Sequence, residues 1–189
     1  MNHPTPRSSP AKSTFGIVPL ILLVIYLYLL TRMILFKGSP IDPGMVKIQL
    51  LAWLQQPDLI YTRTVNLIPF QEISRDWSRL SLHPSHTSIQ LIGNVLAFIP
   101  LGIFIPVLLK RRLLSAVLVL PLSFLLSLAY EVTQLLTGMG IFDVDDLMLN
   151  TTGGVIGYAG FAVIVFFVQW FIGTQSAPTT TQHTSKSGI

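Results

Sequence analysis

Four long apolar runs dominate this sequence and restrict the chain to a membrane protein. A helix needs about 20 mostly apolar residues to cross the hydrocarbon core of a bilayer, which is roughly 30 Å thick. Runs of that length occupy residues 15–36, 89–109, 113–136 and 147–172. Only 11% of the residues are charged, against about 25% in a typical soluble domain. The sequence therefore predicts an all-α fold in which four transmembrane helices form a bundle.

The positive charges of the connections predict how these helices cross the membrane. The short segment between the second and third runs reads Lys110-Arg111-Arg112, and Lys and Arg are enriched in cytoplasmic loops. With four crossings, both termini also face the cytoplasm, while the loop of residues 37–88 and the segment of residues 137–146 face outward. The first run is too long for the apolar part of a cleaved signal peptide, so we expect it to be retained.

Two tails and a surface helix complete the predicted organisation around a membrane domain at residues 15–172. Residues 1–14 are rich in Pro and Ser and residues 173–189 in Thr and Ser, so both are predicted to be disordered cytoplasmic tails. In the outer loop, the apolar stretch 45–56 is too short to span and is expected to lie on the membrane surface. The absence of Cys excludes disulfides and thiolate metal sites.

The third run carries a polar stripe that lipid would reject. Ser123, Ser127 and Glu131 are spaced four residues apart, and Gln134 follows, so all four side chains share one face of a helix. An ionisable side chain within a membrane segment turns toward the bundle interior or toward a wet cavity. The stripe is therefore expected to face inward, and both a packing role and a functional role are open for Glu131.

An acidic cluster opens the fourth run. Asp143, Asp145 and Asp146 follow one another closely in Phe142-Asp143-Val144-Asp145-Asp146. Asp143 is expected to cap the helix, and Asp146, three residues later, resembles the reciprocal partner of a capping box. Capping accounts for two of the three carboxylates, so a ligand-binding role for the cluster is also open.

Glycines and amides indicate where the helices touch. Gly153 and Gly157 form a G-x-x-x-G pair, which allows two helices to approach closely. Asn150 extends this stripe by one turn, and the helix that carries Glu131 is its expected neighbour. The second run adds another buried amide and two residues assigned to structure: Asn94, Pro100 and Gly102.

These polar side chains are predicted to converge at the outer end of the bundle as a ligand-binding site. Its members are Asn94, Glu131, Gln134, Asp143, Asp145, Asp146 and Asn150. No catalytic residue, cofactor or metal is assigned: His83 and His86 lack a third ligand nearby in the sequence and are expected to be solvated. The chain has no phosphate-binding loop, dinucleotide fingerprint or nucleophile elbow, and no nucleic-acid partner is expected.

Several motifs follow one another in a fixed order. They are Asn66-Leu67-Ile68-Pro69-Phe70, Gly93-Asn94 with Phe98-x-Pro100-x-Gly102, Glu131-x-x-Gln134, Phe142-Asp143-Val144-Asp145-Asp146, and Asn150-x-x-Gly153 with Gly157-Tyr158. Over about residues 61–160, more than half of the chain, these motifs resemble those of the VanZ family. The resemblance implies an integral membrane protein of bacteria, in a family whose founding member is associated with resistance to the glycopeptide antibiotic teicoplanin.

The chain departs from this family pattern at one place. Many members carry an Arg shortly before the acidic cluster, whereas residues 138–141 read Gly-Met-Gly-Ile here. A cation at that place would have to come from Arg63, Arg75 or Arg79 in the outer loop.

Three functions are compatible with these features. We favour a non-enzymatic protein of the bacterial plasma membrane that handles lipid-linked or cell-surface ligands on the outer face, including a lipoglycopeptide such as teicoplanin, which joins an acyl chain to a cationic core. The second is an intramembrane enzyme with Glu131 as general acid or base and the Asp cluster around a divalent cation. The third is a small transporter or accessory subunit. The expected partner in every case is the lipid bilayer.

Overall fold

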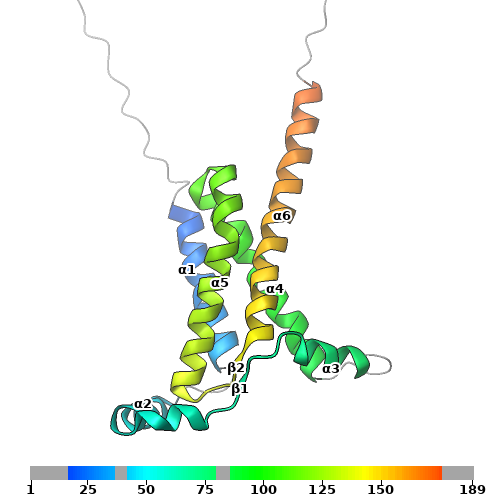
Figure 1. The fold of residues 1–189 in the computed structure, drawn as a ribbon. Coiled ribbons are helices and arrows are strands. Elements are labelled where there is room, and N and C mark those ends of the chain that lie inside the picture. The colour runs from blue at the N-terminus through cyan, green and yellow to red at the C-terminus, as the bar shows by residue number, and fades with distance from the viewer. Residues whose placement is uncertain (1–16, 37–41, 80–85, 176–189) are drawn as a thin grey trace, which may run out of the picture.

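A computed structural model describes residues 17–36, 42–79 and 86–175 of the chain. Four long helices run roughly alongside one another: α1 (Ile17–Phe36), α4 (His86–Leu109), α5 (Arg112–Thr137) and α6 (Val144–Gln175) (Figure 1). Each is long and apolar enough to cross a membrane, which confirms the predicted fold class. α4 and α6 each begin three residues before the predicted run, and α6 continues to Gln175 rather than ending at residue 172. The predicted tails at residues 1–14 and 176–189 lie outside the described residues.

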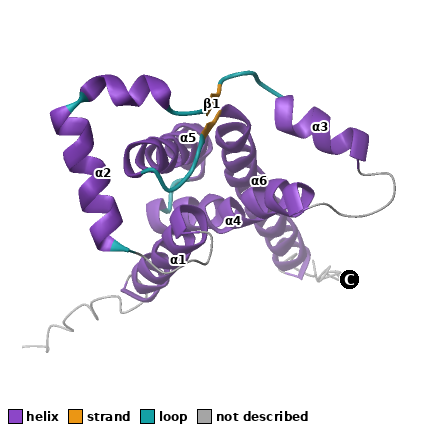
Figure 2. Ribbon diagram, turned by 90° about the horizontal axis from the view of Figure 1, so that it is seen from below, coloured by secondary structure: helices purple, strands orange, loops and turns teal. Residues whose placement is uncertain are grey.

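The two ends of the bundle differ in what they carry. The first described turn of α1, the connection from α4 to α5 and the last turn of α6 lie at one end (Figure 1). The other end, called the loop end below, carries α2 (Pro43–Gln55), the 3-10 helix η2 (Pro57–Thr62) and α3 (Gln71–Arg79). Viewed from that end, α2 and α3 lie on opposite sides of the four long helices (Figure 2). The connections between successive spans thus alternate between the two ends of the bundle, as four crossings require. The outward orientation of the loop end stays a prediction.

Close backbone contacts join α6 to α4. A Cβ added to Gly153 or to Gly157 would collide with backbone atoms of Val95 or Ile99 on α4. In the other direction, a Cβ on Gly102 of α4 would collide with the Gly154 backbone. Lipid gives helices no hydrophobic reason to associate, so small residues that permit close van der Waals contact hold such helices together. Pro100 lies inside α4, half a turn from Gly102.

One face of α5 is turned to the interior. Its buried residues recur every three or four positions and include the predicted polar stripe: Ser115, Val119, Ser123, Ser127, Tyr130, Glu131 and Gln134. Apolar partners from α1 and α4 complete a small core, among them Leu30, Ile34, Phe98 and Leu101. Many other large apolar side chains of the spans are exposed, such as Ile164 and Val117, as expected for surfaces that face lipid.

A helix cap and a short strand pair order the segment between the first two spans. The Asp42 side chain accepts hydrogen bonds from the backbone N–H groups of Gly44 and Met45 and so caps α2. A helix thus forms over most of the predicted surface stretch. Further on, β1 (Val65–Asn66) pairs in parallel with β2 (Phe142–Asp143). This two-stranded pair is an addition that the all-α prediction did not contain.

Candidate functional site

Two distant motifs meet at the loop end. In the β1–β2 pair, Val65 lies opposite Phe142 and Asn66 opposite Asp143. The Asn66 side-chain amide also donates to the Asp143 carboxylate at 3.0 Å. The motif that begins at Asn66 therefore lies beside the acidic cluster at the start of α6.

Asp145 anchors α3 to the start of α6. Its carboxylate is fully buried and accepts backbone N–H groups of Phe70 at 2.5 Å, Glu72 at 2.8 Å and Ile73 at 3.4 Å. A carboxylate is favourable at a helix N-terminus because it complements the helix dipole and the free N–H groups. Phe70 adopts a left-handed backbone conformation, with φ 65°, which is costly for a residue with a side chain. Asp145 therefore fixes the turn that aims α3.

The N-terminus of α6 is capped by Asp143, with a different partner from the one predicted. Asp143 Oδ1 accepts the Asp145 N–H at 2.8 Å, which is the expected N-cap bond. The Asp143 N–H donates to Glu131 Oε2 on α5 at 2.8 Å. The expectation that Asp146 would be this reciprocal acceptor is wrong, because the fully buried Glu131 comes from a neighbouring helix and takes that place.

Side-chain amides tie the spans together near the same end. Asn94 on α4 donates to Asp146 Oδ1 at 2.5 Å. Gln134 on α5 donates to the Ile34 carbonyl of α1 at 2.9 Å. One turn deeper, Asn150 donates to Ser127 of α5 at 2.8 Å, so its neighbour is indeed the helix that carries Glu131.

A polar cavity of about 730 Å³ opens at the loop end between β1, α3, α4 and the start of α6. Its lining includes three carboxylates and one guanidinium, together with amides and a hydroxyl: Glu72, Asp143, Asp146, Arg75, Asn66, Gln71, Gln90 and Thr64. Arg75 forms an ion pair with Glu72 at 2.7 Å. Among the described residues of the lining, carboxylates therefore outnumber cations by three to one.

A second cavity of about 380 Å³ adjoins the first. It is lined by two amides of the predicted site, Asn94 and Gln134, and by apolar residues of α1 and α4 such as Met33 and Ile89. Both cavities share Gln90 and Asp146 in their linings. We call this second space the amide cavity.

The predicted site residues therefore divide into two groups. Asp143, Asp146, Asn94 and Gln134 line one or both cavities, whereas Glu131, Asp145 and Asn150 line neither. The hydrogen bonds described above show the second group bonding to the chain itself.

Six polar lining residues were not among the predicted site residues: Thr64, Asn66, Gln71, Glu72, Arg75 and Gln90. Asn66 stands in the first of the motifs, so its signal was present in the sequence. Nothing distinguishes Glu72 and Gln90 from ordinary polar residues. Among the side chains that the structure describes, no three His or acidic residues are grouped as metal ligands; His83 lies outside the described residues, and the side chain of His86 is not described.

Arg63 supplies the cation near residues 138–141. Gly138 ends α5 in the left-handed conformation, with φ 73°, and the Arg63 guanidinium occupies the space that a side chain at this position would need. The same guanidinium lies 5.9 Å from the centre of the Trp53 ring, whose N–H donates to the Leu136 carbonyl. A cation is favourable at a helix C-terminus. Arg75 lies in the polar cavity instead, and the side chain of Arg79 is not described.

Comparison with known proteins gives one match. A family model described as VanZ/LLP1 matches residues 20–172 of the chain, which includes every residue that lines the two cavities. No curated protein and no solved structure matches it.

Proposed function

This chain belongs to the VanZ/LLP1 family, and from that premise we propose that it binds an envelope ligand at the polar cavity without transforming it. The protein would act in the plasma membrane of a bacterium. Its ligand would be a cationic or hydroxyl-rich molecule held at the outer face of the plasma membrane, such as a lipid-linked envelope component or the lipoglycopeptide teicoplanin. The observation that carries this proposal is the gathering of three carboxylates around one cavity at the end of a membrane bundle.

Charge and size support a ligand of this class. Among the described residues of the lining, Arg75 is the single cation, against the carboxylates of Glu72, Asp143 and Asp146. A cavity lined by more acidic than basic groups attracts positive groups. Asn66 and Gln90 add amides that can bond to hydroxyl or peptide groups of a ligand. The volume of about 730 Å³ falls in the range of roughly 300–1,000 Å³ typical of small-molecule sites.

The position of the polar cavity supports a ligand that is anchored in lipid. Leu91 in the first turns of α4 and Ile141 just before α6 belong to the lining. The cavity therefore lies where two spans end. A molecule held by an acyl chain in the adjacent leaflet reaches this level without leaving the membrane.

The position of Glu131 favours binding over catalysis. A general acid or base must come within hydrogen-bond reach of the group that it protonates or deprotonates. Glu131 lines neither cavity, and its Oε2 accepts the backbone N–H of Asp143. We therefore assign Glu131 to the fixing of the α6 start rather than to an acid–base step.

The test measures ligand binding to the full chain in lipid nanodiscs. Teicoplanin is titrated, with vancomycin for comparison, against the wild type and the double variant Glu72→Gln, Asp146→Asn. Both substitutions keep the side-chain size and remove a carboxylate from the polar cavity. Loss of a charge-assisted hydrogen bond weakens binding by about tenfold or more, so we expect at least that loss of teicoplanin affinity.

The control variant is Asp58→Asn, because Asp58 is an exposed acid of η2 that does not line the cavity. It should bind teicoplanin like the wild type. In cells, the double variant should lose any protection against teicoplanin at an unchanged protein level. Equal affinity of the double variant and the wild type, or no binding by the wild type at all, would contradict the proposal.

A further inference from the structure

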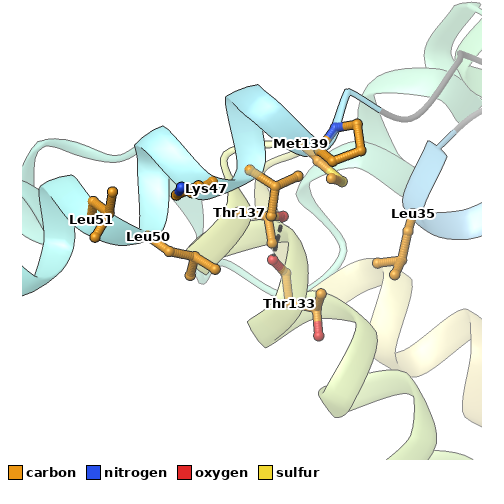
Figure 3. A pocket seen from close by; sticks show the side chains of 9 residues that line it. Leu35, Lys47, Leu50, Leu51, Thr133, Thr137 and Met139 are labelled. Atoms are coloured by element: carbon orange, nitrogen blue, oxygen red, sulfur yellow. Dashed lines mark hydrogen bonds between the residues drawn. The ribbon is translucent and has the colours of Figure 1, made fainter.

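A third cavity, of about 490 Å³, lies beneath α2 at the loop end. We call it the α2 cavity. Its walls come from α1, α2, the end of α5 and the segment after it (Figure 3): Leu35, Pro43, Val46, Lys47, Leu50, Leu51, Thr133, Thr137 and Met139. None of the described residues lines both this cavity and the polar cavity, so the proposed function does not account for it.

The interior of the α2 cavity offers almost nothing to a polar ligand. Thr133 donates its hydroxyl to the Ala129 carbonyl at 2.6 Å, and Thr137 donates to the Thr133 carbonyl at 2.6 Å (Figure 3). Both hydroxyl hydrogens are therefore used within α5. The other residues of the lining are apolar except for Lys47. Water is poorly held in such a space because it finds too few hydrogen-bond partners, whereas a hydrocarbon chain fits it.

The apolar side chains of α2 are poorly covered by the described part of the protein. None of its residues is buried, and Met45, Ile48 and Leu54 are exposed by 65%, 64% and 79%. A helix of 13 residues is marginal without tertiary packing. α2 crosses the ends of the spans (Figures 1 and 2), so lipid is an available apolar partner for these side chains.

Lys47 adds a charge to this apolar space. It is the one ionisable residue among the described residues of the lining, and no described carboxylate forms an ion pair with it. Leu35 and Thr137 belong to the last turns of their spans, so the α2 cavity lies where the apolar spans end and lipid head groups come within reach of Lys47. Basic groups in such pockets attract anionic head groups.

We propose that the α2 cavity holds one acyl chain of an anionic glycerophospholipid from the bilayer, with the lipid phosphate at the Lys47 ammonium. The chain fills the space between α2, α1 and α5, and the head group remains at the membrane surface. The bound lipid thereby covers the face of α2 that lines the cavity, where Leu50 and Leu51 are exposed by 41% and 44%.

The first experiment measures which lipid stays on the protein. The full chain is reconstituted in nanodiscs of mixed phosphatidylglycerol and phosphatidylcholine and released into native mass spectrometry. We expect one retained lipid, with a preference for phosphatidylglycerol. Lys47→Gln should lower that preference by about fivefold, the worth of one Lys beside an anionic lipid surface. Lys47→Arg keeps the charge and should keep the preference.

The second experiment fills the cavity. Thr133→Trp places a large side chain in the α2 cavity and should abolish lipid retention; Leu50→Trp does the same from the opposite wall and serves if the first variant fails to fold. The matched control is Val117→Trp on α5, the helix that also carries Thr133, because Val117 is 65% exposed and lines no cavity described above. It should retain the lipid.

Three results would overturn the proposal. One is equal retention of both lipids, and another is retention that survives both cavity-filling variants. The third is a dimer in the mass spectrum of the wild type that becomes a monomer in these variants. That result would show that a second copy of the chain covers the cavity. Teicoplanin binding at the polar cavity should be unchanged in Thr133→Trp, so this proposal and the proposed function can fail separately.

Discussion

Substitution of Gly157 tests the backbone contact between α4 and α6. A Cβ at this position would lie closer than 3.0 Å to the Ile99 carbonyl oxygen and 2.9 Å from its carbonyl carbon. Because these are backbone atoms, no side-chain rotation relieves the clash, and the helices must separate by roughly 1 Å, which forfeits a large part of the dispersion attraction at the contact. We expect Gly157→Ala to destabilise the bundle by about 1–3 kcal/mol, the usual cost of overpacking, and Gly157→Leu by more.

Gly160 provides the matched control, three residues further along the same helix. A Cβ there meets nothing within 4 Å, so Gly160→Ala should raise stability slightly, since Ala is about 0.5–1 kcal/mol better than Gly in a helix. Stability is measured by reversible unfolding in lipid micelles with increasing denaturing detergent. If Gly157→Ala and Gly160→Ala unfold at the same detergent fraction, the close contact of α4 and α6 is refuted as a source of stability.

Further predictions concern the loop end and the topology. Asp145→Asn removes the charge at the start of α3, so hydrogen exchange of the backbone N–H groups that donate to this side chain should accelerate by about tenfold. Unchanged exchange rates would show that the charge is unimportant there. Glu131→Gln keeps an acceptor for the Asp143 N–H and should leave the melting temperature and protein level near normal, whereas Glu131→Leu should cost about 1–3 kcal/mol of stability because that N–H loses its acceptor. A reporter inserted at Lys110 should read cytoplasmic and one at Asp76 external; the reverse result would invert the placement of both cavities.

The sequence by itself determined the features that depend on local pattern. The length of each apolar run set the four spans, because the thickness of a bilayer fixes how many residues a helix needs. The spacing of Ser123, Ser127 and Glu131 set which face of α5 turns inward, because lipid rejects polar groups. The small residues Gly153 and Gly157 marked the place where another helix comes close.

Only the tertiary structure decided how the acidic cluster is used. Asp145 bonds to the start of α3 across more than seventy positions of the chain, and Glu131 rather than Asp146 accepts the Asp143 N–H. These partners depend on the path that the loop between α1 and α4 takes over the bundle, and no periodicity of the sequence indicates that path. Helix periodicity relates residues within one or two turns, whereas a carboxylate bonds to whichever N–H the assembled fold brings near it.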